Sequence, residues 1–314
     1  MNSKYENSSV MKKNVLLTGG TGFIGKKLTE LLIENGFSVS ILSRTAKQNY
    51  ADISYFQWDV ESGTIDEEAI LKADYVIHLA GENIGAKRWT ASRKKAVLDS
   101  RVKSTKLLST CLKLNNKKLD AFISASGVGI YGAITDEQLC DETTPPANDF
   151  LGTVCQEWES ATIPVHELGI RTVQIRTGLV LGKDDGVLKQ LAPLFCYKLG
   201  SAIGSGKQYM PWIHIDDLCQ IYLKAILDSE MQGPYNAAIN DKTTNTIFSE
   251  TLAKVFGYTI WLPNVPAFVL RLVLGEMAQL VLKGRRVASD KIEKTGFQFK
   301  YTDLEKALHN CLLG

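Results

Sequence analysis

Apolar residues follow two different spacings along the first half of the chain. Short and nearly continuous apolar runs, typical of strands buried on both faces, occupy residues 14–18, 38–42, 55–58, 75–79, 121–125 and 172–176. Segments with apolar positions at helical spacing lie between these runs, at residues 24–35, 66–72, 91–114 and 149–168. This alternation predicts an α/β fold with a doubly wound parallel sheet covered by helices on both faces.

The pattern changes after residue 178. Helical segments separated by turns rich in glycine and proline follow at residues 187–199, 215–227, 245–256, 267–282 and 302–312. We expect the sheet domain to cover residues 11–178 and a smaller, mainly helical lobe to cover residues 179–314, with chain segments free to cross between the two. Residues 1–10 are polar, and we expect them to form a disordered extension.

A glycine-rich turn joins the first predicted strand to the first predicted helix, with the sequence Thr18-Gly-Gly-Thr-Gly-Phe-Ile-Gly25. Glycines at such a turn let the chain bend sharply, let the backbone approach a pyrophosphate and let the helix pack closely on the strand. The arrangement predicts a Rossmann dinucleotide-binding domain; the alternative is a turn without a ligand. The residues expected around the cofactor are Gly19, Thr21, Gly22, Phe23, Ile24 and Gly25.

The end of the second predicted strand indicates which dinucleotide binds. An NAD site would place an acidic residue there to hold the ribose 2′-hydroxyl, and no acid lies between Val39 and Tyr50. Ser43 and Arg44 offer a hydroxyl and a guanidinium that suit a 2′-phosphate, unless Arg44 is an ordinary exposed arginine. We therefore expect NADP(H) in preference to NAD(H). Further cofactor contacts are expected where other strands end, at Asp59, Ala80 and Gly81.

Composition narrows the class of protein. The chain is 45% hydrophobic and 22% charged with a formal net charge of +2, and nothing in this balance favours nucleic acid. Its six cysteines are scattered without metal-ligand spacing, so we expect no metal site and a cytoplasmic protein with free thiols. The longest apolar stretch, residues 266–282, carries Arg271 and Glu276, which favours a buried or interface helix over a membrane span. Either a monomer or a homodimer fits these features.

Later motifs resemble the extended short-chain dehydrogenases of the NAD-dependent epimerase/dehydratase superfamily. These motifs are His78-Leu-Ala-Gly81, Ser126-Gly-Val-Gly-Ile-Tyr-Gly132, Arg176-Thr-Gly-Leu-Val-Leu-Gly182 and Pro211-Trp-Ile-His-Ile-Asp-Asp217. The chain is most similar to the atypical subfamily called epimerase family proteins in bacteria, which includes the human short-chain dehydrogenase family 39U member. The marks of this subfamily and its C-terminal domain are Gly81-Glu-Asn-Ile84, Arg88-Trp-Thr90, Ser100-Arg101, Trp158-Glu159, Gly275-Glu-Met277 and Gly296-Phe297.

The chain departs from the superfamily at its catalytic positions. The resemblance implies a Tyr-x-x-x-Lys pair, in which the lysine and the cofactor ribose lower the pKa of the tyrosine for proton transfer. Leu151 occupies the tyrosine position and Cys155 the lysine position, while Gly127 replaces a serine or threonine. The resemblance also implies that Arg101 and Cys155 face the cofactor. The alternatives are a surface ion pair for Arg101 and a packing role for Cys155.

Other residues are therefore candidates for the chemistry. Glu82 could act as a base, Tyr131 as a proton donor and Ser126 as a hydrogen-bond donor to a substrate carbonyl; the alternatives are a solvated loop acid and two turn residues. Trp89, Trp212 and His214 are candidate substrate contacts. The alternatives are core tryptophans and a histidine that orients the second lobe.

These features predict an NADP(H)-binding, oxidoreductase or epimerase-like enzyme without the standard Tyr-x-x-x-Lys pair, acting on an unknown small molecule. The alternative is a non-catalytic NADP(H)-binding regulatory protein. A link to cell division is implied only by a label that some members of the resembling subfamily carry.

Overall fold

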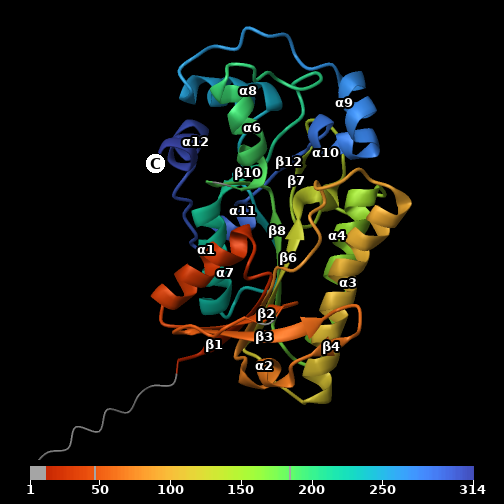
Figure 1. The fold of residues 1–314 in the computed structure, drawn as a ribbon, viewed down its shortest axis with the longest axis vertical. Helices are drawn as coiled ribbons and strands as arrows, with labels where there is room; N and C mark the ends of the chain where they lie inside the picture. The colour runs from red at the N-terminus through yellow and green to blue at the C-terminus, as the bar shows by residue number, and fades with distance from the viewer. Residues whose placement is uncertain (1–11, 46, 184) are drawn as a thin grey trace, which may run out of the picture.

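The computed structural model describes residues 12–45, 47–183 and 185–314, and an eight-stranded sheet forms its centre (Figure 1). The strand order is β11-β8-β6-β5-β1-β2-β3-β4, and all neighbours are parallel except the antiparallel pair β3–β4. The strands are β1 (Asn14–Thr18), β2 (Ser38–Ser43), β3 (Ile53–Asp59), β4 (Thr64–Ile65), β5 (Tyr75–His78), β6 (Ala121–Gly127), β8 (Thr172–Thr177) and β11 (Gly233–Ala237). The predicted doubly wound parallel sheet is confirmed.

Helices cover both faces of the sheet because its central strands are apolar on both sides. In β1, Val15 and Leu17 join the core beneath one set of helices, whereas Leu16 joins the core on the opposite face. The first set contains α1 (Phe23–Glu34) and α7 (Ile215–Leu227). The second set contains α2 (Glu67–Lys72), α3 (Ala91–Leu114), α4 (Phe150–Ser160) and α5 (Ile163–Glu167).

Two long predicted helices are interrupted. The helix expected at residues 149–168 divides into α4 and α5 because Pro164 has no backbone N–H with which to continue the helical hydrogen bonds. The segment expected at residues 267–282 breaks at Gly275, where φ is +61°, into α9 (Ala267–Leu274), the 3₁₀ turn η2 (Gly275–Ala278) and α10 (Gln279–Leu282). Among the described residues, no helix is both long and apolar enough to cross a membrane.

A smaller lobe lies beyond the carboxyl ends of the sheet strands (Figure 1). Three of its helices share a separate hydrophobic core: α6 (Gly186–Cys196), α8 (Asn245–Val255) and α12 (Leu304–Leu313). Short pieces complete it and join it to the sheet domain, namely η1 (Val128–Tyr131), α11 (Asp290–Glu293) and the strand pairs β9 (Leu179–Leu181) with β10 (Trp212–His214) and β7 (Leu139–Cys140) with β12 (Arg286–Val287). Within residues 179–314, α7 and β11 return to the central sheet.

A buried carboxylate attaches the C-terminal segment to the sheet domain. Asp217, in the first turn of α7, accepts hydrogen bonds from the backbone N–H groups of Lys300 at 2.8 Å and Tyr301 at 3.0 Å. Its side chain is almost fully buried, and burial raises the pKa of the carboxyl group. The two backbone donors therefore hold a costly buried carboxylate in place, which makes the contact sensitive to any change in its acceptor atoms.

Asp217→Asn is expected to lower the free energy of unfolding by about 1–3 kcal/mol, because the new NH₂ group would face a backbone N–H and leave that donor unsatisfied. The neighbouring variant Asp216→Asn is the matched control. Asp216 is partly exposed and lies 3.6 Å from each of Lys27 and Lys300, so its loss should cost about 0–1 kcal/mol. Urea denaturation followed by circular dichroism measures both. Equal losses in the two variants would contradict the role assigned to Asp217.

Candidate functional site

The strand order reverses between β1 and β5, which is where an open parallel sheet binds its ligand. Thr18, the last residue of β1, stands at this crevice. Its Oγ1 accepts hydrogen bonds from the backbone N–H groups of Leu79 and Ala80, each at 3.1 Å. Oγ1 also lies 2.7 Å from Nδ1 of His78. Because both lone pairs of Oγ1 already accept from Leu79 and Ala80, the hydroxyl group of Thr18 must donate its proton to Nδ1.

The tautomer of His78 follows from this contact. Because Nδ1 accepts a proton from Thr18, Nε2 carries the ring hydrogen and donates it to Oγ of Ser104 at 3.0 Å. Ser104 in turn donates to the carbonyl oxygen of Ser100, one turn earlier in α3. Burial lowers the pKa of His78 to about 3, so the ring is neutral. The chain of hydrogen bonds joins β1, β5 and α3 beside the crevice.

The glycine turn has the shape that the sequence predicts for a pyrophosphate site. Gly19 adopts φ +71°, and the backbone N–H of Gly22 donates to the Gly19 carbonyl oxygen at 3.0 Å. A Cβ at Gly25 would lie 2.2 Å from that oxygen, so only glycine allows this approach. No side chain caps α1 at Gly22, which leaves N–H groups of the first helical turn free for a phosphate. The site therefore fits a dinucleotide.

Cations gather where β2 ends. Arg44 is exposed and forms no ion pair with any described residue. The hydroxyl oxygen of the neighbouring Ser43, the last residue of β2, accepts a hydrogen bond from the backbone N–H of Thr45. Glu82, in the loop after β5, has its pKa lowered chiefly by a hydrogen bond from Arg93, with smaller contributions from Arg44 and Lys87. An anionic ligand entering here would meet a free guanidinium.

The other predicted cofactor residues lie in two different settings. Asp59 is exposed and accepts backbone hydrogen bonds from Glu61 and Ser62, which lower its pKa and form a tight turn after β3. Ala80 and Gly81 line the crevice after β5. Arg101 lies directly against Gly81: a Cβ there would sit 3.1 Å from the guanidinium carbon.

Arg101 is a largely buried cation without a carboxylate partner among the described residues. Its Nη1 donates to the carbonyl oxygens of Glu82 and Val97, both at 3.0 Å, and its guanidinium carbon lies 4.9 Å from the ring centre of Trp158. Burial lowers the pKa of this guanidinium. The structure thus holds a positive charge beside the crevice by carbonyl groups and an aromatic face.

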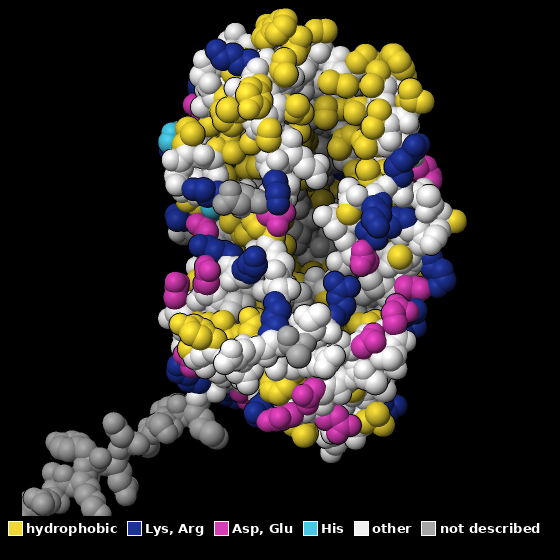
Figure 2. All heavy atoms as spheres, in the orientation of Figure 1, with side chains coloured by type: hydrophobic (Ala, Val, Ile, Leu, Met, Phe, Trp, Pro, Cys, Tyr) yellow, Lys and Arg dark blue, Asp and Glu magenta, His cyan; other side chains and the backbone are white. Residues whose placement is uncertain are grey.

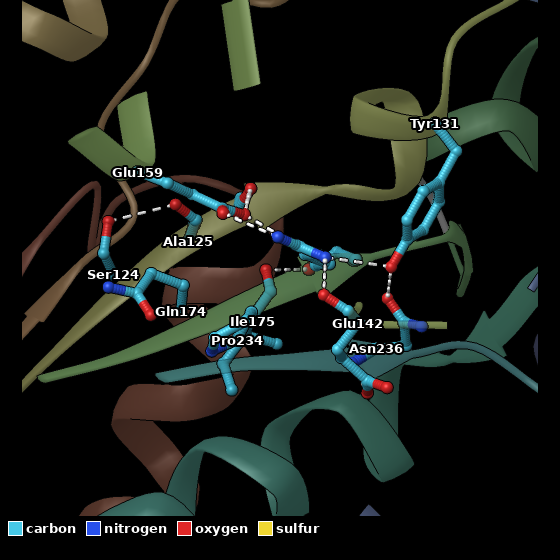
Figure 3. A network of polar contacts seen from close by, with 12 residues as sticks. Ser124, Ala125, Tyr131, Glu142, Glu159, Gln174, Ile175, Pro234 and Asn236 are labelled. Atoms are coloured by element: carbon cyan, nitrogen blue, oxygen red, sulfur yellow. Dashed lines mark hydrogen bonds and ion pairs between the residues drawn. The ribbon is translucent and has the colours of Figure 1, made fainter. Parts of the chain in front are cut away.

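A buried polar network lies beneath the carboxyl ends of β6 and β8 (Figure 3). Arg176 donates from Nε and Nη2 to the two carboxylate oxygens of Glu159, at 2.8 and 2.9 Å, and from Nη1 to the Tyr131 hydroxyl at 3.0 Å. Tyr131 donates in turn to Oδ1 of Asn236 at 2.7 Å, and Ser126 donates to Glu159 at 2.7 Å. The network connects β6, α4, η1, β8 and β11.

This network determines the surroundings of two candidate catalytic residues. The hydroxyl proton of Tyr131 is engaged by Asn236, and burial raises the pKa of Tyr131 to about 12. The hydroxyl proton of Ser126 is engaged by Glu159, and Ser126 is buried. Glu82, the third candidate, is partly exposed and forms an ion pair with Arg93 at 2.8 Å. Among the three, only Glu82 is open to a ligand in this conformation.

The positions of the missing Tyr-x-x-x-Lys pair lie beside two glycines. A Cβ at Gly129 would be 3.5 Å from Cβ of Leu151 and 3.7 Å from Sγ of Cys155, and one at Gly127 would be 3.6 Å from the same sulfur. Cys155 is buried, and burial raises the pKa of its thiol to about 12. The thiol is therefore neutral at physiological pH and is not poised as a nucleophile.

The three predicted substrate contacts pack inside the protein. Trp212 has no exposed surface and donates its indole N–H to Asp241 at 2.8 Å. His214 caps α7 by accepting the N–H of Asp216 and stacks on Tyr301, with ring centres 3.8 Å apart. Trp89 is also buried and donates to the carbonyl oxygen of Ile84. None of these side chains faces an open surface in the described structure.

The sequence assigned no role in the site to the central members of the network, Arg176, Glu159 and Asn236, although Arg176 and Glu159 lie in motifs of the resembling family. A usable signal was present, since a charged residue inside the apolar strand Thr172–Thr177 requires a buried partner. The partner itself could not be identified, because nothing in the spacing of the chain connects Arg176 to Glu159 or Tyr131 to Asn236.

The environment of the cysteines predicts their reactivity. Iodoacetamide at pH 8 is expected to modify Cys196, which is exposed, and to leave Cys155 intact because its thiol is buried and protonated. Peptide mass spectrometry of the folded protein measures modification at each site, and the urea-unfolded protein, in which every thiol should react, is the control. Rapid modification of Cys155 in the folded protein would show a reactive thiol and contradict its packing role.

Comparisons with known proteins agree with this geometry. Residues 15–238 match the NAD dependent epimerase/dehydratase family, and residues 265–311 match a domain of unknown function, DUF1731. The epimerase family protein YfhF of Bacillus subtilis is 35% identical over 300 residues, which span 95% of this chain and 98% of the relative.

Solved structures extend the likeness to three dimensions. The crystal structure of human epimerase family protein SDR39U1 with NADPH is similar at a TM-score of 0.84 and 31% identity, covering 96% of this chain and 99% of the human one. UDP-glucose 4-epimerase from Thermotoga maritima, solved with UDP-glucose, shares the fold at a TM-score of 0.75 and 20% identity, covering 95% and 97% of the two chains. This chain belongs to the NAD dependent epimerase/dehydratase family and carries the DUF1731 domain at its C-terminal end.

Proposed function

We propose that the protein is an NADPH-dependent oxidoreductase that acts on a small molecule between the sheet domain and the smaller lobe. One observation carries the choice of cofactor: Arg44 stands free beside Ser43 at the end of β2, where an NAD site would place an acid. The glycine turn supports dinucleotide binding by its shape. The human relative SDR39U1, 31% identical, was solved with NADPH.

The chain's own groups divide the work of this site. The first turn of α1 binds the pyrophosphate, while Ser43 and Arg44 bind the 2′-phosphate. Arg101 places a positive charge near the ribose next to Gly81. When bound, NADPH supplies a hydride. Glu82, kept anionic by Arg93, accepts a hydrogen bond from a substrate hydroxyl or N–H group and so orients the substrate.

Arg44→Asp is expected to weaken NADPH binding by about 1.5–3 kcal/mol, or roughly tenfold to a hundredfold, because it replaces a charge-assisted phosphate contact by repulsion. NADH binding should weaken little, since NADH lacks the 2′-phosphate. The control is Lys106→Asp, which makes the same charge change on the exposed side of α3. Titration by isothermal calorimetry gives both affinities. If the wild-type protein bound NADH more tightly than NADPH, the cofactor proposal would be wrong.

A non-catalytic NADPH-binding regulatory role is the second candidate function. The observation that favours it is the buried network around Arg176, in which the hydroxyl protons of Tyr131 and Ser126 are already donated to Asn236 and Glu159. In such a protein the bound cofactor would alter a surface that a partner recognises.

Turnover separates the two candidate functions. The NADPH-loaded protein is screened against carbonyl compounds while cofactor oxidation is followed by absorbance, and an enzyme should oxidise NADPH with at least one class. Glu82→Gln should then lower kcat/KM by about tenfold to a hundredfold, since it removes the charge that orients the substrate. Glu61→Gln, a change of an exposed acid, is the control. Tight NADPH binding with no oxidation across the panel would favour the regulatory role.

A further inference from the structure

Helix α9 presents apolar side chains that stay exposed in the described part of the chain. Seven of its eight residues are apolar, and none of them is buried. Phe268, Leu272 and Val273 are 70%, 76% and 60% exposed. Large apolar side chains gathered in this way on a folded protein mark a surface that binds another molecule.

A second apolar surface lies on the C-terminal end of α6 and the turn that follows it. Leu194, Tyr197 and Leu199 are exposed there. Trp261, also exposed, donates its indole N–H to the carbonyl oxygen of Lys198 at 3.0 Å, which holds the segment after α8 against the same turn. This surface is therefore continuous across two parts of the chain.

One face of the molecule is hollowed between the part of the smaller lobe that contains α6 and the part that contains α9 (Figures 1 and 2). Figure 2 shows a cleft in one face, with hydrophobic side chains on both of its flanks over the smaller lobe and charged side chains gathered farther along, over the sheet domain. Among the residues of α6, α9 and α10, only Lys189 and Arg271 carry a charge. The lobe end of the cleft is thus an apolar channel.

Each flank is anchored to one side of the cofactor crevice. The α6 flank begins at the glycine turn, because the ring of Phe23 would lie 2.4 Å from a Cβ at Gly182, just before α6. The α9 flank ends beside the loop after β5 and the start of α3. Lys94, in the first turn of α3, forms an ion pair with Glu276 at 2.6 Å, and a Cβ at Gly275 would lie 3.1 Å from Arg88 in the loop. The cleft therefore leads from the apolar flanks of the smaller lobe to the cofactor crevice.

We propose that the lobe end of this cleft binds the apolar body of the substrate, a carbonyl compound with a hydrocarbon chain or ring, and not a nucleoside diphosphate. A diphosphate would require several converging cationic side chains, whereas Arg271 is the single cation of α9 and α10 and most of the other side chains there are hydrocarbon. The concave shape and its continuity with the cofactor crevice favour a small molecule over a second copy of the chain. This assignment rests on the proposed function in one respect, namely that the cofactor binds in the crevice at the inner end of the cleft.

The test uses the full-length protein loaded with NADP⁺ and the fluorescent apolar probe 1-N-phenylnaphthylamine. We expect saturable probe binding that 2-decanone displaces and UDP-glucose does not. Leu272→Ser should weaken probe binding by about tenfold, because it replaces one of the exposed apolar side chains of α9 by a polar one. Leu114→Ser is the matched control: Leu114 is equally exposed, 78% against 76%, and lies at the end of α3 away from the cleft.

Three results would overturn the assignment. They are displacement of the probe by UDP-glucose, unchanged probe affinity in Leu272→Ser, and a dimer in analytical ultracentrifugation that Leu272→Ser converts to a monomer without altering probe affinity. The last result would identify α9 as an interface between copies. NADPH affinity is measured separately in each variant and should stay unchanged. If the wild-type protein failed to bind NADPH, the proposed function would be refuted, and probe affinity would be measured in the cofactor-free wild type and variants to decide the apolar assignment separately.

Discussion

The single proton of the Thr18 hydroxyl organises the ligand-binding crevice. Because two backbone N–H groups already donate to Thr18 Oγ1, its proton must go to His78, and this sets the tautomer through which His78 reaches Ser104 in α3. The strands β1 and β5 and the helix α3 are thereby held in one arrangement where the strand order of the sheet reverses. The loop after β5, which carries Glu82 and leads to Arg101, starts from this fixed position.

The crevice has two parts. In the first, polar groups are free to bind a ligand, and in the second, polar groups already hydrogen-bond to one another. The glycine turn, Ser43 and Arg44 leave N–H groups, a hydroxyl and a cation free for an anionic ligand. Around Arg176, in contrast, donors and acceptors satisfy one another inside the protein. Leu151 and Cys155, at the positions that the resemblance assigns to proton transfer, thus lie near a region whose polar groups pair with one another, and the proposed function assigns substrate binding to groups at the cleft surface.

The sequence predicted the parts of the fold that depend on local pattern. Strands buried on both faces are continuous apolar runs, so β1, β2, β5 and β6 were found, and the glycine turn follows from backbone sterics alone. β11 was missed, since Pro234 and Asn236 give it no apolar run. The buried pairing of Arg176 with Glu159 and the exposed apolar face of α9 depend on how distant segments meet, and residue spacing carries no such information.

The contacts between β7 and β12 and between Asn236 and Ala288 make two regions of the chain depend on each other. The two regions recognised as separate families along the sequence share strand pairing and a buried amide, so their boundary in sequence is not a boundary in structure. Neither region has a complete set of hydrogen-bond partners alone. The two regions therefore form one structural unit, in which a substitution on either side of the shared surface must be compatible with the other side.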